Sequence, residues 1–297
     1  MSAGLLVAQA LTRAHRIAPR AAGYVWTSIF TNTRGLGTIP NDLCPLGASR
    51  VELTGVPRVA AVYVWGSAEP TVLALHGWGA DSTTMSSVVA AATDSGESAV
   101  CFDAPGHGVS PGTQATMREY ADATLAVLQR FPSITTIVAH SFAAIAAVSA
   151  VAAAASDSVR FLLLLAPACS LSDVLERWAA HRDLPPAVVE QIRRELRRRD
   201  GMEVSHWDVR TLGLPASVRV QILHDPADAL VPVSDSYRIA ASISAEVQAT
   251  VPGVGHHRIV SCHETRRALT ARAVPSDRAS STRPCAGTPP GTNFSVV

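Results

Sequence analysis

The 297-residue sequence has few charged and few aromatic side chains: Asp, Glu, Lys and Arg make up 16% of it, and Phe, Trp and Tyr 5%. The formal net charge at pH 7 is +1, so no global charge excess indicates nucleic acid or an acidic partner. No apolar run approaches the roughly 20 residues of a membrane-spanning helix. Hydrophobic residues nevertheless make up 47% of the chain, which excludes global disorder and is enough for a sizeable core.

The sequence also lacks a cysteine pattern typical of disulfides or metal sites. It has five cysteines, an odd number, with no CxxC pair among them: Cys44, Cys101, Cys169, Cys262 and Cys285. We interpret them as reduced thiols of a cytoplasmic protein. No basic stretch precedes the apolar residues near the start, so a secretory signal is not expected. No trio of histidines has metal-ligand spacing, and we expect neither a metal nor a cofactor.

Acidic residues are absent from residues 1–41, where arginines are interleaved with apolar residues. This pattern is typical of a basic amphipathic helix, so a weak peripheral contact with an anionic membrane is one interpretation. Pro19 and Gly23 interrupt the helical periodicity, and we therefore favour an N-terminal helix packed on the body of the protein. Glycines and prolines follow it, and we assign residues 1–48 to an N-terminal helical extension.

Strands and helices are predicted to alternate over residues 49–272. Short continuous apolar runs, typical of strands buried on both faces, are followed by segments with helical spacing. This alternation argues for a parallel sheet covered by helices on both faces. The predicted strands are 51–54, 58–65, 71–75, 99–102, 134–138, 161–165, 218–223 and 246–251. The predicted helices are 83–92, 117–130, 143–155, 233–243 and 257–271.

The alternation breaks at residues 170–212, where two or three helices are predicted without a strand between them. An arginine-rich helix face in this stretch is interspersed with acids, so we expect a solvated surface rather than a nucleic-acid patch. A helical insertion at this point predicts a lid over a cleft. Residues 273–297, rich in Ser, Thr, Pro and Gly, are predicted to be a disordered tail.

A serine occupies the junction between the strand at 134–138 and the helix at 143–155. Ser141 is flanked two residues away by Ala139 and Ala143. Small flanks are what a sharp strand-to-helix turn requires, because the two backbones nearly collide there, and such a turn holds the hydroxyl above the sheet edge. These residues alone also fit a serine that caps the helix.

A serine nucleophile at pH 7 needs a base, and the base needs an orienting acid. In a parallel sheet these groups are expected at the carboxyl ends of later strands. Asp225 and Asp228 follow one predicted strand, and His256 and His257 follow the next. The order serine, aspartate, histidine is that of the nucleophile-elbow hydrolases.

Four motifs, in this order and spacing, together resemble the α/β-hydrolase fold superfamily over residues 50–272. The resemblance implies a mostly parallel eight-stranded sheet with helices on both faces and a helical lid. Alanine stands at both elbow flanks, where glycine is usual. The motifs are Leu75-His76-Gly77-Trp78-Gly79 for the oxyanion loop, Asp103-Ala104-Pro105-Gly106-His107-Gly108-Val109-Ser110 for the turn after the next strand, Ala139 to Ala143 for the elbow, and Asp228 to Pro232 with Gly255-His256 for the acid and histidine turns.

The resemblance implies a catalytic triad of Ser141, Asp228 and His256. It favours Asp228 over Asp225 because the family's D-x-x-V-P pattern aligns on Asp228, and His256 over its neighbour because His256 directly follows a glycine. It also implies an oxyanion hole formed by the main-chain N–H groups of Trp78 and Phe142. Three further histidines of the motif loops are expected to fix loop hydrogen bonds: His76, His107 and His140.

These residues predict a serine hydrolase that cleaves a carboxylic ester or thioester through an acyl-enzyme. Carbon–carbon bond hydrolysis and cofactor-free peroxidase chemistry on the same fold are alternatives, as is a hydrolase-like binding module without turnover. The predicted partner is a small ester-type substrate, and nucleic acid is not expected. Apolar residues of the insertion favour an apolar substrate moiety: Leu171, Val174, Leu175, Trp178 and Leu184.

Overall fold

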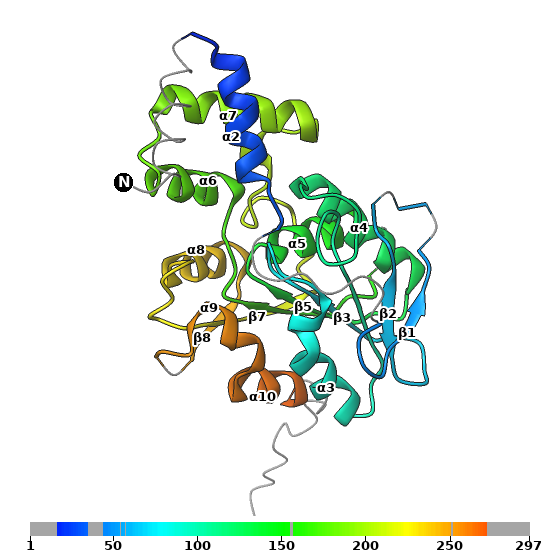
Figure 1. The fold of residues 1–297 in the computed structure, drawn as a ribbon. Helices are drawn as coiled ribbons and strands as arrows, with labels where there is room; N and C mark the ends of the chain where they lie inside the picture. Colours follow the sequence, from blue (N-terminus) through cyan, green and yellow to red (C-terminus); the bar gives the residue numbers. More distant parts are fainter. Residues whose placement is uncertain are drawn as a thin grey trace, which may run out of the picture.

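An eight-stranded sheet forms the centre of the computed structural model, which describes residues 17–34, 44–53, 55–56, 58–154, 157–250 and 252–271 (Figure 1). The strand order is β1-β2-β4-β3-β5-β6-β7-β8. Strands β1 and β2 pair antiparallel, β2 is antiparallel to β4, and the remaining pairs are parallel. The strands are β1 Ser49–Val51, β2 Val62–Trp65, β3 Val72–Leu75, β4 Ala99–Phe102, β5 Thr136–His140, β6 Phe161–Leu165, β7 Arg219–His224 and β8 Glu246–Ala249.

The central strands are buried along their whole length because both of their faces are covered. Every residue of β3, β5 and β6 is buried. Strands β5 and β6 run in parallel register from Thr136 opposite Phe161 to His140 opposite Leu165. The predicted fold class, a mostly parallel eight-stranded sheet covered by helices, is therefore confirmed.

Helices cover both faces of this sheet (Figure 1). On one face lie α3, Ser86–Asp94, and α10, His263–Ala271; on the other lie α4, Met117–Arg130, α5, Ala143–Ala153, and α8, Val233–Ile243. Helix α5 is apolar all round and is almost wholly buried, as expected of a helix enclosed by the core. Thr116 and Glu119 form a capping box that starts α4.

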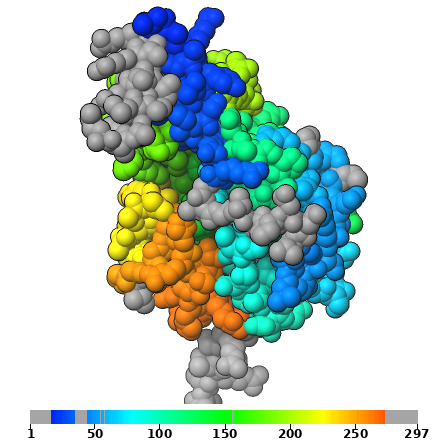
Figure 2. Space-filling view, in the orientation of Figure 1, coloured from blue at the N-terminus to red at the C-terminus, as the bar shows by residue number. Residues whose placement is uncertain are grey.

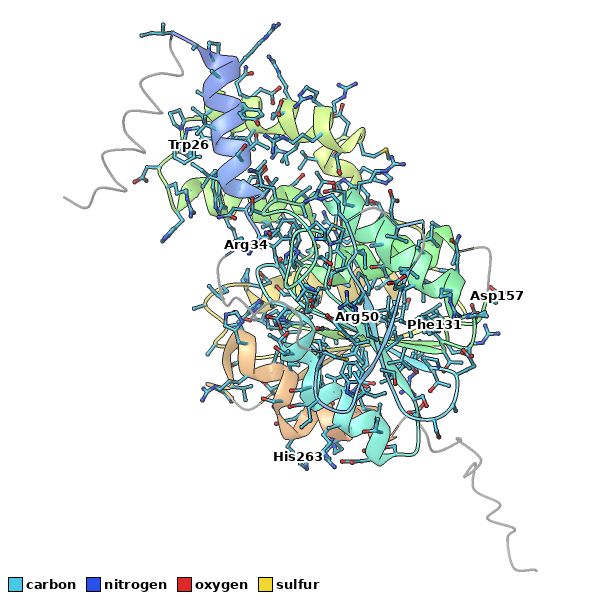
Figure 3. The ribbon with its side chains drawn as sticks, turned by 45° about the vertical axis from the view of Figure 1, so that its right-hand side comes forward. Trp26, Arg34, Arg50, Phe131, Asp157 and His263 are labelled. Carbon is cyan, nitrogen blue, oxygen red and sulfur yellow. The ribbon has the colours of Figure 1, made fainter. Side chains whose placement is uncertain are left out.

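Three further helices lie beyond one end of the sheet (Figures 1 and 3). Helices α6, Leu171–Ala180, and α7, Pro186–Asp200, are inserted between β6 and β7, whereas α2, Pro19–Phe30, comes from the N-terminal segment. Helix α2 packs on α7, and a Cβ atom added at Gly23 would lie 2.8 Å from the Gln191 Cβ. In Figure 3 the chain runs from Trp26 in α2 to Arg34, which lies beyond the end of α2 where the chain reaches the body of the molecule. No helix in the described ranges is long and apolar enough to cross a bilayer.

Several predicted boundaries are wrong; the strand predicted at 134–138, for example, is β5 at Thr136–His140. The predicted helix 257–271 is divided into α9, Gly255–Arg258, a 3-10 turn and α10, because Cys262 is extended with φ −73° and ψ 161°. The strand predicted at 58–65 begins only at Val62, since Arg58 has a left-handed backbone with φ 64°. The strand predicted at 51–54 is β1, which ends at Val51. The predicted tail at 273–297 lies outside the described residues.

Candidate active site

Ser141 lies in a strained turn between β5 and α5. Its φ is 58°, a left-handed value that is uncommon for a residue other than glycine. Two main-chain hydrogen bonds with the end of β6 and the loop after it stabilise this conformation. The Ser141 N–H donates to the Leu165 carbonyl at 2.8 Å, and the Ala168 N–H donates to the Ser141 carbonyl at 3.2 Å. Ala139 and Ala143 are completely buried, so alanine is small enough for both flanks of this elbow.

The structure brings Ser141, His256 and Asp228 into one hydrogen-bonded chain. The Ser141 Oγ lies 2.9 Å from His256 Nε2, and His256 Nδ1 lies 2.7 Å from Asp228 Oδ2. Ser141 follows β5, Asp228 follows β7, and His256 lies in α9 after β8. The three groups thus meet at the carboxyl edge of the sheet, where parallel topology gathers functional side chains.

The Asp228 carboxylate is buried and fixed by main-chain donors. Its Oδ1 accepts from the N–H groups of Leu230, at 2.8 Å, and Val231, at 3.0 Å, which leaves Oδ2 for His256. Burial alone would raise the pKa of Asp228, but its contacts with His224, His256 and the Val231 N–H outweigh burial and hold that pKa well below its ordinary value. The carboxylate is therefore ionised at neutral pH.

Asp225 and His257, the rejected candidates, do not join this chain. The Asp225 carboxylate accepts from the main-chain N–H groups of Ala227, Gly253 and Gly255, so that it holds the loop in front of His256. The His257 ring lies 5.2 Å, centroid to centroid, from that of His256. Asp225 is a scaffold for the histidine turn, and His257 is its neighbour without a bond to Ser141.

His140 links the elbow to the histidine turn, a role that the sequence indicated only as a loop hydrogen bond. Burial lowers the pKa of His140 to about 3, so the ring is neutral and its Nε2–H donates to the His256 carbonyl at 2.8 Å. On its other side, a Cβ atom added at Gly77 would lie 2.8 Å from His140 Nδ1 and 3.3 Å from the Ser141 Cβ. Its place directly before the elbow serine is the one signal in the sequence that could have indicated this role.

The turn at Asp103–Ser110 is a scaffold for the oxyanion loop. Asp103 accepts from the Ser82 N–H at 2.7 Å and from the Val109 N–H at 3.0 Å. His76 Nε2 accepts from the Ala104 N–H at 3.0 Å, so the ring proton is on Nδ1, which donates to the Gly77 carbonyl at 2.8 Å. The expectation that His76 fixes loop hydrogen bonds is met in this geometry, and His107 likewise lies 3.0 Å from the Pro105 carbonyl.

The predicted oxyanion residues lie beside Ser141 in the same pocket. Phe142 is the N-cap of α5, where main-chain N–H groups have no partner within the helix. The Trp78 ring packs edge-on against Phe142 with a centroid distance of 5.2 Å, and its Nε1–H donates to the Asn32 carbonyl at 3.1 Å. The indole thus forms part of the pocket wall.

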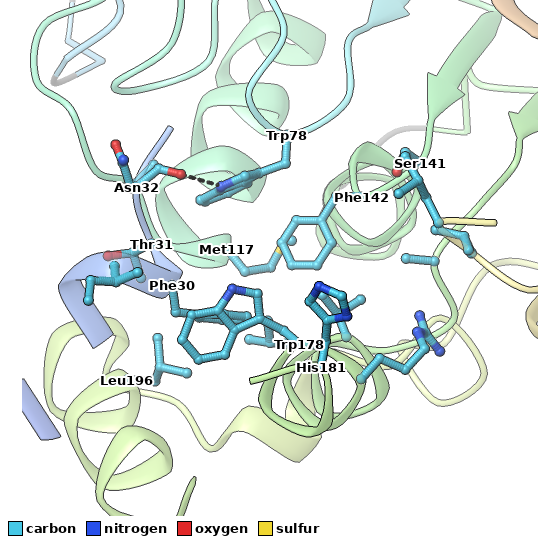
Figure 4. A pocket seen from close by; sticks show the side chains of 18 of the residues that line it. Phe30, Thr31, Asn32, Trp78, Met117, Ser141, Phe142, Trp178, His181 and Leu196 are labelled. Atoms are coloured by element: carbon cyan, nitrogen blue, oxygen red, sulfur yellow. Dashed lines mark hydrogen bonds between the residues drawn. The ribbon is translucent and has the colours of Figure 1, made fainter. Parts of the chain in front are cut away.

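A pocket of about 770 Å³ contains the exposed side of Ser141 and His256 (Figure 4). This volume is typical of small-molecule sites. Its lining is mostly apolar and comes from α2, α4, α6, α7, the elbow and the loops after β3 and β7, with Phe30, Trp78, Met117, Phe142, Leu171, Val174, Trp178 and Leu196 among the residues. Ionisable side chains of the lining are Arg34, Arg177, His181, Arg182, Asp200 and His256. In the described part of the chain, no three His, Cys, Asp or Glu side chains are grouped so as to hold a metal ion.

A strained serine after a central parallel strand, with an acid and a histidine after the next strands, defines the class of α/β hydrolases. The model of the Alpha/beta hydrolase family matches residues 72–273, more than half of the sequence, and the chain belongs to this family, whose members are generally hydrolytic enzymes. No protein with a curated description matches the sequence.

Solved structures show the same fold at low identity. The alpha/beta hydrolase domain-containing protein 10 from mouse is 18% identical, with a TM-score of 0.60, over 76% of this chain and 96% of that one. An esterase from Pyrococcus furiosus is 17% identical, with a TM-score of 0.55, over 82% and 94%. The thioesterase domain from the curacin biosynthetic pathway is 15% identical, with a TM-score of 0.52, over 76% and 97%.

Proposed function

We propose that the protein is a serine hydrolase that cleaves carboxylic esters or thioesters. Ser141 is the nucleophile, His256 the general base and Asp228 the orienting acid. The observation that carries the proposal is the continuous chain from Ser141 Oγ to His256, 2.9 Å, and from His256 to Asp228, 2.7 Å, at the wall of an apolar pocket. Its geometry matches the hydrogen-bond reach required of a nucleophile, its base and the group that orients the base.

The reaction follows from this arrangement. His256 Nε2 takes the Ser141 proton while Oγ attacks the substrate carbonyl carbon, and the main-chain N–H groups of Phe142 and Trp78 stabilise the oxyanion. Collapse of the tetrahedral intermediate expels an alcohol or thiol, which receives that proton from His256. Water then loses a proton to His256 and attacks the carbonyl carbon of the acyl-enzyme. The second tetrahedral intermediate collapses, the acid leaves, and His256 returns that proton to Ser141 Oγ. The ionised Asp228 stabilises the imidazolium in both steps.

The pocket indicates the apolar part of the substrate. Leu171, Val174 and Trp178 of α6 line it, so the insertion at 170–212 acts as the lid of this site. Burying one methylene of an acyl chain against such a lining contributes about 0.8 kcal/mol to binding. The substrate is therefore an ester or thioester with an apolar acyl group.

A fluorophosphonate probe and a series of p-nitrophenyl esters test the proposal. The wild type should be labelled on the peptide that contains Ser141, and Ser141→Ala should lose both labelling and turnover with its circular dichroism unchanged. His256→Ala should lose turnover, whereas the matched variant His257→Ala, one residue away and without a bond to Ser141, should keep it. Turnover that survives in Ser141→Ala would refute the assignment, and a folded wild type without label or turnover would indicate a non-catalytic binding module.

A further inference from the structure

One wall of the pocket comes from outside the part of the chain that matches the family. The end of α2 and the turn after it contribute Ile29, Phe30, Thr31 and Asn32 to the lining, while the family match begins at residue 72. In Figure 2 the blue N-terminal segment lies over the green segments of the insertion and reaches the body of the molecule. This wall therefore comes from residues that precede the matched region.

Aromatic contacts fix α2 to the insertion. The Phe30 ring packs edge-on against Trp178 of α6, with centroids 5.1 Å apart and an interplanar angle of 72°. Trp26, only 2% exposed, packs against the same indole at 6.0 Å. Pairs of this geometry contribute beyond their buried area. Phe30 and Trp178 thus pack together in the lining of the pocket.

Hydrogen bonds fix the turn after α2 to the body of the enzyme. The Thr33 N–H donates to the Thr113 carbonyl at 3.0 Å, and the Ala115 N–H donates to the Thr31 carbonyl at 3.2 Å. The Asn32 carbonyl accepts from Trp78, which stands in the oxyanion loop. From α7, Arg199 donates to the Ser28 hydroxyl at 3.0 Å. The wall is thus bonded both to α7 of the insertion and to the body of the protein, so it sets a steric limit on the substrate.

Phe30 lies at the end of the pocket remote from the nucleophile. Figure 4 shows Ser141 at one side of the pocket, Phe30, Trp178 and Leu196 at the opposite side, and Phe142 with Met117 between them. An acyl chain whose carbonyl carbon is at Ser141 therefore runs along Phe142 and Met117 toward Phe30. We propose that Phe30, supported by Trp178, closes this end and selects the substrate by acyl-chain length, with straight-chain apolar acyl groups as the substrate class. The catalytic part of this inference rests on the proposed function.

The catalytic test compares p-nitrophenyl esters from butanoate to dodecanoate. In the wild type, kcat/KM should rise with chain length and then fall once the chain reaches Phe30. In Phe30→Ala the maximum should move to longer chains, because each additional methylene accommodated raises kcat/KM about fourfold. Phe30→Trp should move it to shorter chains. The control is Val25→Ala, a substitution on the exposed side of the same helix, which should leave the profile unchanged.

A binding test separates this inference from the proposed function. In the Ser141→Ala background, titration calorimetry with hexanoate, decanoate and dodecanoate should show that Phe30→Ala tightens binding of the longest carboxylate relative to the shortest by tenfold or more. Phe30→Leu, which retains an apolar side chain against Trp178, replaces Phe30→Ala if that variant unfolds. Length profiles that stay parallel to the wild type in every Phe30 variant would overturn the inference. A chain-length shift in binding without esterase activity would support the wall and refute the catalytic proposal.

Discussion

Asp228→Asn tests whether the carboxylate fixes the tautomer of His256. An asparagine has one oxygen and one NH₂ group, whereas both carboxylate oxygens of Asp228 now accept hydrogen bonds. Oδ1 faces the N–H groups of Leu230 and Val231, and Oδ2 faces His256 Nδ1. If the amide oxygen takes the Oδ1 position, its NH₂ group donates to Nδ1, which then has to be an acceptor. The proton of the neutral ring moves to Nε2, and Nε2 can no longer take the proton of Ser141.

The magnitude follows from the alternative orientation of the amide. Turning it to restore the correct tautomer leaves the part-buried Val231 N–H without its acceptor, at a cost of about 1–3 kcal/mol, whereas the exposed Leu230 N–H can bond to water instead. The competent orientation is then about 2 kcal/mol above the other, so its population is about 3%. We expect kcat to fall at least about 30-fold, and up to about 10⁴-fold when the lost charge on the acid is added.

Steady-state kinetics on one soluble p-nitrophenyl ester measures this loss. KM should change little because Asp228 is not among the pocket-lining residues. Asp225→Asn is the matched control: it removes a buried carboxylate three residues away that binds main-chain N–H groups and does not contact His256, so it should lower stability far more than kcat. A folded Asp228→Asn protein with kcat within about tenfold of wild type would refute the reasoning.

Two further predictions concern the neighbours of Ser141. Gly77→Ala places a Cβ 2.8 Å from His140 Nδ1 and should displace the loop that carries the Trp78 N–H. In ester assays kcat should fall about 10²- to 10³-fold while the protein stays folded. An unchanged kcat would exclude Trp78 from the oxyanion hole. His140 has a folded-state pKa of about 3 against about 6.5 unfolded, so its contribution to stability is present above about pH 6.5 and is lost as pH falls toward 3. Urea unfolding at pH 4 to 7 measures how the free energy of unfolding changes with pH. This slope should be smaller in His140→Gln than in the wild type by up to about 1.4 kcal/mol per pH unit, and equal slopes in the two proteins would contradict a buried neutral ring.

The sequence predicted the sheet and the trio of site residues because both depend on local patterns. Buried strands such as β6 are continuous apolar runs, and Ser141, Asp228 and His256 each stand in a short motif just after a strand. The choice of Asp228 over Asp225 came from the resemblance, because the family's D-x-x-V-P pattern aligns on Asp228, Val231 and Pro232. In the structure, Val231 donates its N–H to the Asp228 carboxylate, so this spacing reflects a turn that fixes the acid.

The sequence did not predict the wall formed by α2, because its contacts join residues far apart in the chain. Pro19 and Gly23 were interpreted as breaks in the helical pattern. Pro19 is in fact the first residue of α2, where a missing N–H costs nothing, and Gly23 lies where the backbones of α2 and α7 meet at Gln191. The divided helix after His256 was missed for a related reason: Cys262 turns the chain, and the Thr265 hydroxyl then donates to the Ile259 carbonyl at 2.6 Å.

The left-handed conformation of Ser141 makes its chemical reactivity depend on the folded state of the whole sheet. The bond from its N–H to Leu165 forms only when β6 is in register beside β5, and Ala166 next to it, with φ 46°, is held in turn by the Leu223 carbonyl of β7. A chain in which these strands have separated loses the two hydrogen bonds that hold this turn. Under the proposed function, recovered activity therefore reports that the three adjacent strands β5, β6 and β7 have assembled correctly.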